Sequence, residues 1–445
     1  MVVNAYEKNG ECTQGAIDKA IAIVTNNRGG IVKLKRNGTY VLRPREEHVF
    51  NLPSNVTIDG NGATLLIEDG TNTSSFTWDA VFYCENNSNI IIRNLNLDAN
   101  GRNNPVVQHS KPSGPSRHNG LLSALRVNNV YIQNCTVSDS KGYGCLYLGY
   151  CDNVTVTNCR FYDIGVEHSN ENIGDASVIM GVGNNWLIEN NEMKNSYLSN
   201  CGTGLDLGCS HSIIKRNVIE SFWAGMNLAN NGVTECKNNT IDNNKFVNNG
   251  TAIYLWATTE PYIGSCHDNN IINNKIIWYP KSIWGVRGID LSFFVYGKVY
   301  NIVLERNFFI ANSQQSDHTT PFYEMAIHVG PAEKTYSGKP NYGGEVYSIS
   351  IISNVVEGCS GPAFLIDSRV NDVVIKDNKL DNVSSGESEY SSKAAIVVTN
   401  LTGSKTHSPQ KVTLSRNVVV GKGRNCKQFS FVKGSDVMIY DDNKF

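Results

Sequence analysis

The sequence has almost no net charge and no long apolar run. Its 39 lysines and arginines offset 41 aspartates and glutamates, which leaves a formal net charge of −2. Nucleic-acid-binding proteins usually carry a basic stripe, and a membrane-spanning helix needs about 18 or more consecutive apolar residues. We therefore expect no nucleic acid and no membrane among the partners of this chain.

Metal-binding cysteine motifs are also missing. The chain has 12 cysteines, but no two are separated by two residues, as they are in zinc ribbons and thioredoxin-like redox sites. A disulfide framework is typical of short secreted chains, whereas a free cysteine fills a core as a small apolar residue. The sequence therefore predicts buried thiols and no resident metal or cofactor.

No linker and no leader segment stand out. The chain lacks long Pro/Ser runs, blocks of like charge and low-complexity tracts. Its first ten residues, MVVNAYEKNG, have neither the charged region nor the apolar core of a secretion signal. We therefore expect either a secreted, extracellular protein whose signal is missing from this sequence or a virion-associated protein.

A short β-branched run that ends at an asparagine recurs along the chain. Examples are NVYIQNCTV at 129–137 and NVTVTNCRF at 153–161. Twelve such runs are spaced 24 to 47 residues apart. Their final asparagines are Asn94, Asn134, Asn158, Asn190, Asn217, Asn244, Asn274, Asn307, Asn354, Asn378, Asn417 and Asn443.

The alternation of apolar and polar residues in these runs is typical of strands, whereas a helix would place apolar residues three and four apart. Parallel strands stacked one coil above another, at about 4.8 Å, would bring the asparagines into a ladder at a tight turn. Asparagine accepts the left-handed backbone of such a turn, and its amide can bond to the next one in the stack. The sequence therefore predicts an all-β fold, a single-stranded right-handed parallel β-helix of about a dozen coils.

Residues 1–50 are expected to form an N-terminal cap, and residues 51–445 the β-helix. A cap is needed because the end of a solenoid exposes an open strand edge and an apolar core. The segment GGIVKLKRNGTYVL at 29–42 predicts two strands joined by an Asn-Gly turn into a hairpin. Before it, Thr13 is a candidate N-cap of an amphipathic helix. The apolar face of this helix carries Ala16, Ile17, Ala20, Ile21 and Val24.

This helix, the Gly-Gly pair and the strand GTYVL resemble the N-terminal segment of the pectate lyase superfamily. The stretch KNGECTQ replaces the acidic sequence that this family usually carries before the helix. The resemblance implies a right-handed parallel β-helix and a carbohydrate substrate. It transfers no catalytic residue, because the Gly-His-Gly of the polygalacturonase-like hydrolases and the Tyr-Gly-x-Asp-Pro-His of the alginate epimerases are both missing.

Each coil has another strand whose middle residue is expected to point outward. Small residues, among them Gly204, Gly225 and Gly288, lie two positions before this residue. The pattern indicates the floor of a shallow groove that suits an extended polysaccharide. The expected outward residues are Ser123, Tyr147, Ile179, Asp206, Asn227, Tyr254, Asp290, His328, Leu365 and Val397.

Asp206 is the candidate catalytic residue, because it lies in the middle of this column between two glycines. Glycoside hydrolases use two carboxyl groups, about 5–5.5 Å apart for retention and about 6.5–9.5 Å apart for inversion. The preceding loop, GVEHSNENIGDAS at 165–177, supplies Asp175 and Glu167 as candidate catalytic partners, with His168 nearby. One carboxyl would act as the general acid and the other as base or nucleophile.

The other candidate site residues are expected to bind substrate, since aromatic rings stack on sugars and polar side chains bind hydroxyl groups. Trp278, Tyr279 and Trp284 offer further rings. Alternatively, Tyr254, Arg287 and His328 would serve a lyase, with calcium bridging an acidic sugar to Asp206 and Asp290. The predicted substrate-binding set is Tyr147, His168, Trp223, Asn227, Tyr254, Trp256, Arg287, Asp290 and His328.

Three functions stay open at this point. The first is an endo-acting glycoside hydrolase that degrades a polysaccharide held along the groove. The second is a lyase or epimerase acting on a uronate-containing glycan, and the third is a glycan-binding phage tailspike or adhesin. An exposed apolar strip near Leu365 and Val397 would favour a homotrimer and the tailspike, whereas a monomer would favour a secreted enzyme.

Overall fold

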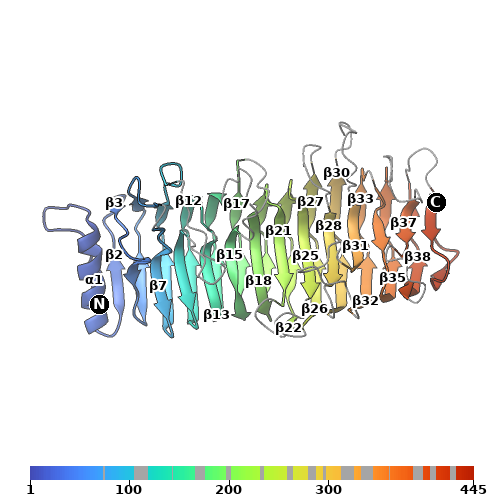
Figure 1. Cartoon of the computed structure of the whole chain (residues 1–445), viewed down its shortest axis with the longest axis horizontal. Helices are drawn as coiled ribbons and strands as arrows, with labels where there is room; N and C mark the ends of the chain where they lie inside the picture. The colour runs from blue at the N-terminus through green and yellow to red at the C-terminus, as the bar shows by residue number, and fades with distance from the viewer. Residues whose placement is uncertain are drawn as a thin grey trace. The chain divides into compact units, whose positions relative to one another are not determined.

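Figure 1 shows the chain in a computed structural model. The chain forms two compact units. Unit 1 comprises Met1–Leu207 and Arg216–Val218, and unit 2 comprises Gly208–Lys215 and Ile219–Phe445. Within the described ranges, no helix is long and apolar enough to cross a membrane. The structure describes residues 1–73, 76–104, 119–142, 144–165, 176–196, 202–230, 235–257, 264–278, 287–293, 297–311, 325–331, 344–359, 361–383, 394–400, 407–420 and 427–444.

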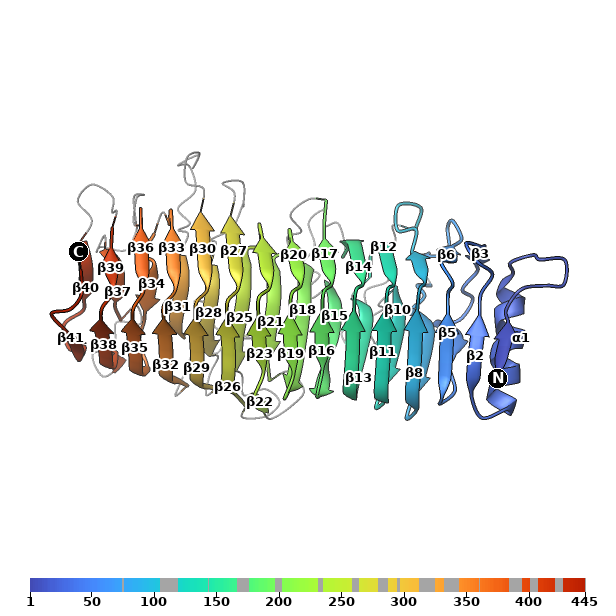
Figure 2. The ribbon, with the colours of Figure 1, turned by 180° about the vertical axis from the view of Figure 1, so that it is seen from behind.

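Each unit is built from coils of three strands, and corresponding strands of successive coils pair in parallel. In unit 1, for example, the strand at 120–125 pairs with the one at 144–157. In unit 2, the strand at 251–257 pairs with the one at 287–293. Figure 2 shows the second and third strands of the coils stacked within each unit. The predicted stack of parallel coils is therefore confirmed.

The coils follow one order, which we number as first, second and third strand; β13 supplies both the first and the second strand of its coil. The first strands are β4 (His48–Asn51), β7 (Ala80–Glu85), β10 (Gly120–Leu125), β13 (Gly144–Thr157), β15 (Ala176–Asn184), β18 (Gly202–Ser210), β21 (Ala224–Ala229), β25 (Thr251–Ala257), β28 (Arg287–Phe293), β31 (Met325–Pro331), β34 (Phe364–Ile366), β37 (Ala394–Val398) and β40 (Lys427–Phe431). The second strands are β2 (Gly30–Lys33), β5 (Val56–Asp59), β8 (Ser88–Arg93), β11 (Asn128–Gln133), β16 (Leu187–Glu189), β19 (Ile213–Lys215), β23 (Thr240–Asp242), β26 (Ser265–Ile272), β29 (Lys298–Glu305), β32 (Glu345–Ile352), β35 (Val370–Lys376), β38 (Gln410–Ser415) and β41 (Val437–Ile439). The third strands are β3 (Thr39–Leu42), β6 (Thr64–Ile67), β9 (Asn96–Asp98), β12 (Thr136–Ser140), β14 (Arg160–Ile164), β17 (Glu192–Lys194), β20 (Val218–Glu220), β24 (Lys245–Val247), β27 (Lys275–Trp278), β30 (Phe308–Ala311), β33 (Val355–Glu357), β36 (Lys379–Asp381) and β39 (Val418–Val419).

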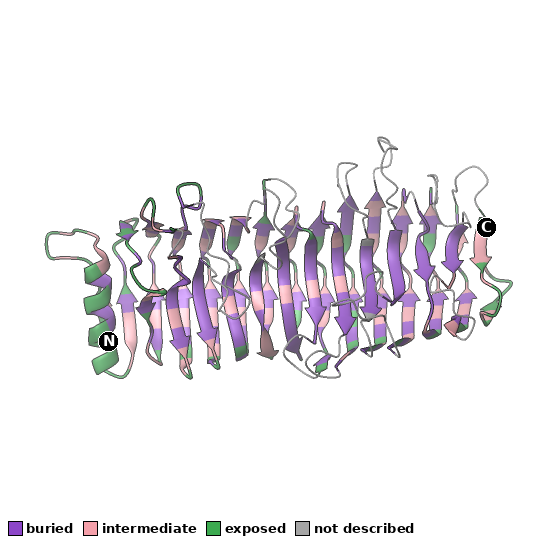
Figure 3. Ribbon diagram, viewed as in Figure 1, coloured by how far each residue is buried: buried purple, intermediate pink, exposed green. Residues whose placement is uncertain are grey.

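Apolar side chains fill the inside of the coils. In unit 1, Phe82, Leu122, Leu146 and Ile179 lie opposite one another on successive first strands and are fully buried. Figure 3 shows the buried residues running along the strands, interrupted by residues that face outward. This alternation arises because successive side chains of a strand point to opposite faces.

The predicted N-terminal helix is confirmed as α1 (Gln14–Asn26). The Oγ1 atom of Thr13 accepts a hydrogen bond from the backbone N–H of Ala16 at 3.1 Å, so Thr13 is its N-cap. The helix contacts β1 (Val2–Asn4), β2 and β3 of unit 1. Its buried residues are the five expected, Ala16, Ile17, Ala20, Ile21 and Val24.

The hairpin expected at 29–42 is wrong. Strand β2 pairs in parallel with β1 and β5, and β3 pairs in parallel with β6 in a separate sheet. Between them, Asn37 has a left-handed backbone, with φ of 53°. The Asn-Gly turn therefore directs the chain from one face of the coil to the next, because each strand gains its hydrogen bonds from a neighbouring coil.

The asparagines form two adjacent columns instead of the single ladder expected. Asn134 and Asn158 have left-handed backbones, with φ of 52° and 56°, and their side chains are exposed. The buried position of the turn is the next residue, which is Cys135 or Cys159 in these coils. Asparagine takes the buried position from Asn191 onward. In unit 1 these buried residues are Asn191 and Asn217, and in unit 2 they are Asn244, Asn274, Asn307, Asn354, Asn378 and Asn417.

Asn307 shows how this ladder joins three coils. Its Oδ1 atom accepts hydrogen bonds from the backbone N–H and the Nδ2 atom of Asn274, both at 3.0 Å. Its own Nδ2 atom donates to the carbonyl of Ile271 at 2.8 Å and to Oδ1 of Asn354 at 3.1 Å. These bonds satisfy buried polar groups that could not reach water.

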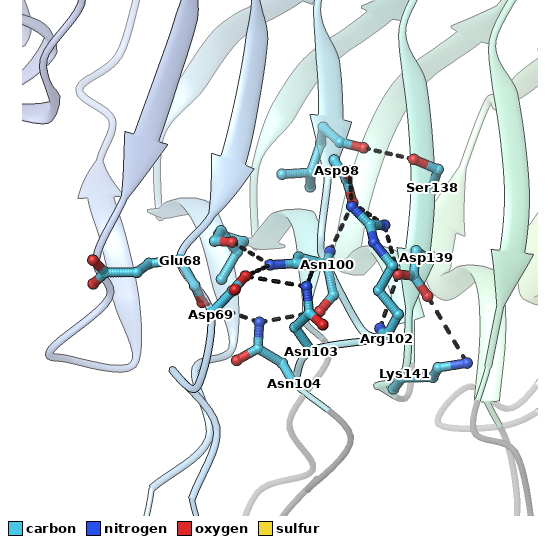
Figure 4. A network of polar contacts seen from close by, with 12 residues as sticks. Glu68, Asp69, Asp98, Asn100, Arg102, Asn103, Asn104, Ser138, Asp139 and Lys141 are labelled. Carbon is cyan, nitrogen blue, oxygen red and sulfur yellow. Dashed lines mark hydrogen bonds and ion pairs between the residues drawn. The ribbon is translucent and has the colours of Figure 1, made fainter.

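A second polar network closes the turns of the early coils in unit 1, as Figure 4 shows. The buried Asn100 donates through Nδ2 to Oδ1 of Asp69 at 2.7 Å. Arg102 bridges two coils, because its guanidinium lies 2.7 Å from a carboxylate oxygen of Asp98 and 2.9 Å from one of Asp139. The hydrogen bond that Arg102 donates to Asp98 raises the pKa of Arg102. The network therefore fixes these turns from coil to coil.

The cysteines of the described segments are free thiols, and all of them except Cys12 are buried. This confirms the expected use of cysteine as a core residue. Burial raises the pKa of the Cys84 thiol and of the Cys209 thiol to about 12. A thiol that stays protonated at neutral pH is a weak nucleophile, so these side chains serve packing.

We expect Asn307→Ala to lower the free energy of unfolding by about 3 kcal/mol, because it leaves several buried amide and carbonyl groups without partners. Denaturant titration followed by circular dichroism would measure the change. The matched control is Asn371→Ala, an exposed asparagine on β35 of the same unit, which should change stability by less than about 0.5 kcal/mol. Equal effects of the two substitutions would contradict the role given to the ladder.

Candidate functional site

The first strands of unit 2 present a column of outward side chains in register. Tyr254 on β25 lies opposite Asn227 on β21 and Asp290 on β28. His328 on β31 follows Asp290, and Leu365 and Val397 continue the row. The expected register is confirmed here. We call these residues the outward column of unit 2.

Unit 1 has a corresponding outward column. Its members are Asn51, Tyr83, Ser123, Tyr147 and Met180, on β4, β7, β10, β13 and β15. The expected member Ile179 is wrong, since Met180 lies opposite Tyr147 and Ile179 is buried in the core. The register between β13 and β15 shifts by one residue, and counting along the sequence cannot show this shift.

Asp290, Ser292 and His328 form a buried hydrogen-bonded group. Nδ1 of His328 lies 2.8 Å from Oδ1 of Asp290, and the hydroxyl of Ser292 donates to the same oxygen. The side chains of His328 and Asp290 are only 2% and 4% exposed, so the expected open groove floor is wrong at these two positions. Since a carboxylate oxygen accepts, Nδ1 of His328 carries the proton. Nε2 is then the atom that can accept a proton from another group.

Tyr254, Trp256 and Asn227 form a second group in unit 2. Trp256 is buried and donates through Nε1 to Oδ1 of Asn227. Its ring lies 6.2 Å from that of the half-buried Tyr254, centroid to centroid. Trp256 therefore positions Asn227 and Tyr254 and offers little free ring face of its own. Trp223, by contrast, is 42% exposed.

The small residues beside the outward column of unit 2 have a packing role. A Cβ atom at Gly288 would lie 2.4 Å from the carbonyl oxygen of Ala326 and 2.6 Å from Cε1 of Phe309. One at Gly225 would lie 2.7 Å from both the carbonyl oxygen of Ala252 and a ring carbon of Phe246. Both glycines are needed where the chain passes close to its neighbours. They are therefore no sign of a groove floor.

Two sets of residues that were expected to be exposed are buried. Leu365 and Val397 are buried in an apolar cluster with Met325 and Ala394, so the expected exposed apolar strip is wrong. Trp278, expected as a ring for sugar stacking, lies in the core 6.3 Å from the ring of Phe309. Neither group is open to a ligand.

A polar cluster in unit 1 was missed by the sequence reasoning. Nε2 of His48 lies 3.2 Å from Oδ2 of the buried Asp79, and the His48 ring stacks on Tyr83 at 4.0 Å. Tyr83 donates to Glu85 at 2.6 Å, and Arg126 pairs with Glu85. Burial, followed by the hydrogen bond to Glu85, raises the pKa of Tyr83 to about 12.

This cluster extends to Tyr147 of the outward column. Burial raises the pKa of Tyr147, and the negative charge of Asp79 adds to the shift. The tyrosine hydroxyls of this face are therefore protonated at neutral pH and can donate hydrogen bonds. Only the pairing register could have revealed the cluster, because His48 and Asp79 are 31 residues apart in the chain.

No protein-family model matches the chain, and no curated protein matches it in sequence. Among solved structures, it is similar to the tailspike protein of E. coli bacteriophage HK620 in complex with a pentasaccharide, with a TM-score of 0.59 and 13% identity over 99% of this chain and 78% of that one. It is also similar to PfbA, a surface adhesin of Streptococcus pneumoniae (TM-score 0.55, 16% identity, 95% and 87% covered). A third match is the A-module of the Azotobacter vinelandii mannuronan C-5 epimerase AlgE6 (TM-score 0.52, 14% identity, 98% and 96% covered). The chain has the right-handed parallel β-helix fold.

Asp206 lies on β18 of this β-helix, within unit 1. It is half-buried between Leu205 and Leu207, which are fully buried, so it points away from the core. Its expected partners Asp175 and Glu167, and the nearby His168, lie outside the described residues. So do Tyr279, Trp284 and the side chain of Arg287. The catalytic pair therefore stays a prediction.

Metal binding by the β-helix also stays a prediction. Among the described residues, no group of three or more histidine, cysteine, aspartate or glutamate side chains is placed to hold a metal ion. In unit 2, Asp290 already accepts hydrogen bonds from His328 and Ser292.

We expect the Nδ1 proton of His328 to exchange slowly and to resonate far downfield, because Asp290 accepts it in a buried site. Proton–nitrogen NMR of protein labelled in histidine would detect it, with His328→Gln assigning the signal. Asp290→Ala should remove it. A His328 signal that persists in Asp290→Ala would contradict the pairing.

We expect Gly288→Ala to destabilise the protein by about 1–3 kcal/mol, because its methyl group would overlap Ala326 and Phe309. Gly15→Ala is the control, since a Cβ atom there meets nothing within 4 Å. That change in α1 should stabilise the helix by about 0.5–1 kcal/mol. Thermal unfolding would compare them, and an unaffected Gly288→Ala variant would restore the interpretation as an open floor.

Proposed function

We propose that the protein binds an extended polysaccharide along its outward columns and hydrolyses internal glycosidic bonds of that polysaccharide. The observation that carries this proposal is the register of polar and aromatic side chains on successive first strands. Tyr83, Ser123 and Tyr147 recur coil by coil in unit 1, and Asn227 and Tyr254 do so in unit 2. A row that repeats about every 4.8 Å suits a polymer of repeating sugars. The tailspike bound to a pentasaccharide and the mannuronan epimerase support this class of ligand.

The proposed hydrolytic centre belongs to unit 1. Asp206 would be one carboxyl, and Asp175 or Glu167 the other, with His168 and Tyr147 binding the sugar beside them. General acid catalysis would protonate the leaving oxygen, while the second carboxylate acts as nucleophile or base. Within unit 2, Trp223, Asn227, Tyr254 and Arg287 would bind a glycan, while the buried Trp256, Asp290 and His328 would position the residues around them.

A lyase or epimerase is the second candidate, and the Asp290–His328 pair favours it. In this function the sugar would have to uncover His328, whose side chain is 2% exposed. Nε2 would then be the base for a proton next to a carboxylate group of the sugar, because Asp290 holds Nδ1–H. Tyr254 and Arg287 would then assist. Charge neutralisation of the uronate would need a cation, and calcium is the cation that oxygen ligands bind most readily in such sites.

Binding without cleavage is the third candidate, and the tailspike and adhesin neighbours favour it. Such a protein would act at a virion or cell surface, and an enzyme would act outside the cell. We expect a homotrimer if the protein is a tailspike and a monomer if it is a secreted enzyme. Product analysis separates these three functions.

We expect the protein to generate new reducing ends from a polysaccharide without absorbance at 235 nm, which unsaturated uronates would give. Asp206→Asn should slow this reaction by about 100-fold or more, as is typical for loss of a general acid or base. The assay would use a panel of neutral and acidic polysaccharides. The matched control is Asp436→Asn, an exposed aspartate directly before β41 of unit 2, which should keep full activity.

Absorbance at 235 nm would contradict hydrolysis and favour the lyase. In that case His328→Ala should abolish the signal. Binding of a glycan with no cleavage of any member of the panel would favour the tailspike or adhesin.

A further inference from the structure

A polar cavity lies on the second strands of unit 2, which is not where the outward column lies. Its volume is about 570 Å³, within the range of about 300–1,000 Å³ typical of small-molecule sites. We call it the polar trough. The lining residues used below are Asp268, Asn270, Asn301, Ser348, Ser350 and Asp372.

Four successive second strands that line the trough have a left-handed residue at the same position. Asp268, Asn301, Ser348 and Asp372 have left-handed backbones, with φ of 53°, 53°, 55° and 59°. Pairing of the flanking residues places these four opposite one another on β26, β29, β32 and β35. Figure 2 shows these strands side by side in unit 2. These residues therefore align in one row along the coils.

An aromatic stack borders one side of this row. The ring of His267 lies 4.4 Å from that of Tyr300, and Tyr300 lies 4.8 Å from Tyr347, with nearly parallel planes. Because these rings cover one another, they offer few open faces, and none of the three lines the trough itself. On the other side, Asn270, Val303 and Ser350 lie opposite one another and point outward.

The floor of the trough is fixed by its own hydrogen bonds. Asp268 accepts from Nδ2 of Asn301 at 3.0 Å and from Nδ1 of His267 at 2.6 Å. Ser348 donates its hydroxyl to Asp372 at 2.9 Å. The hydrogen bond from His267, followed by that from Asn301, lowers the pKa of Asp268, so this carboxyl is ionised at neutral pH.

Asn270 and Ser350, by contrast, have side chains that are available to a ligand. In the described part of the chain, neither side chain makes a hydrogen bond. Asn270 is exposed and Ser350 is half-buried. The trough thus combines preorganised carboxylates with a free amide and a free hydroxyl, spaced by whole coils of about 4.8 Å.

We propose that the polar trough is a second saccharide-binding site that takes a neutral glycan through its hydroxyl groups. The inference rests on the proposed function only for the class of ligand. Amides, hydroxyls and carboxylates bind sugar hydroxyls in both donor and acceptor roles. Carboxylates at two positions of the row repel a uronate, so an acidic glycan is excluded. The coil-by-coil repeat lets one chain contact several coils at once.

Titration calorimetry with cellohexaose, xylohexaose and mannohexaose tests the site, with hexagalacturonate as the acidic comparison. Ser350→Trp fills the trough, and we expect it to remove one binding site or weaken binding at least tenfold. Thr413→Trp is the matched control, because Thr413 lies in the same outward row two coils further on and does not line the trough. It should bind like the unaltered protein. Circular dichroism checks that both variants fold.

Ser350→Ala is the milder second variant, and losing one hydroxyl should weaken binding several-fold. The proposal is overturned if none of the three neutral hexasaccharides binds, or if Ser350→Trp and Ser350→Ala bind like Thr413→Trp. It is also overturned if hexagalacturonate binds in the trough as well as the neutral probes do.

Cleavage assays on the same variants keep this inference separate from the proposed function. If the Ser350 variants keep both cleavage and unaltered binding, the trough proposal is overturned and the proposed hydrolase function stands. If the protein cleaves no polysaccharide but binds a glycan in the trough, and Ser350→Trp abolishes that binding, the hydrolase proposal is overturned and the trough proposal stands.

Discussion

The hydrogen bond from one asparagine amide to the next is the interaction on which the coils of unit 2 depend. Within unit 2, a ladder asparagine bonds to the coil before it and the coil after it, as Asn307 does with Asn274 and Asn354. Leaving any of these groups unpaired in the core is costly, so neighbouring coils cannot slip relative to each other. Equivalent positions therefore align in unit 2, and its outward column and the polar trough both depend on that alignment.

Much of the fold could be predicted because its signals are local and repeated. Alternation identified the strands, and the apolar face of α1 is the one that is buried. The errors have one cause, which is that register is not a local property. Three predictions were made from the local pattern of a single segment. They are the hairpin at 29–42, the choice of Ile179 over Met180, and the placing of Asn134 in the buried ladder. In each case the partner strand in the next coil decides the outcome.

The site was less predictable, since burial depends on what lies above a residue. Asp290 and His328 have the polar character of a solvated strand face, and nothing in their local sequence shows that they pair out of solvent. Gly288 has the opposite difficulty, because a glycine at a tight contact and a glycine in an open floor look the same in sequence. His48, Asp79 and Tyr83 meet only through the pairing of β4 with β7.

The division of each turn into a left-handed outer residue and a buried inner one separates two tasks. The inner residue carries the coil-to-coil bonds, while the outer one only has to accept its backbone geometry, which asparagine, arginine, serine and aspartate all do here. The outer residue of the turn can therefore vary without disturbing the hydrogen bonds of the core. Coils of very different lengths can therefore stack on the same pattern of strand pairing. A connection between strands can be lengthened, and can bring new side chains to the surface, while the buried contacts between coils stay unchanged.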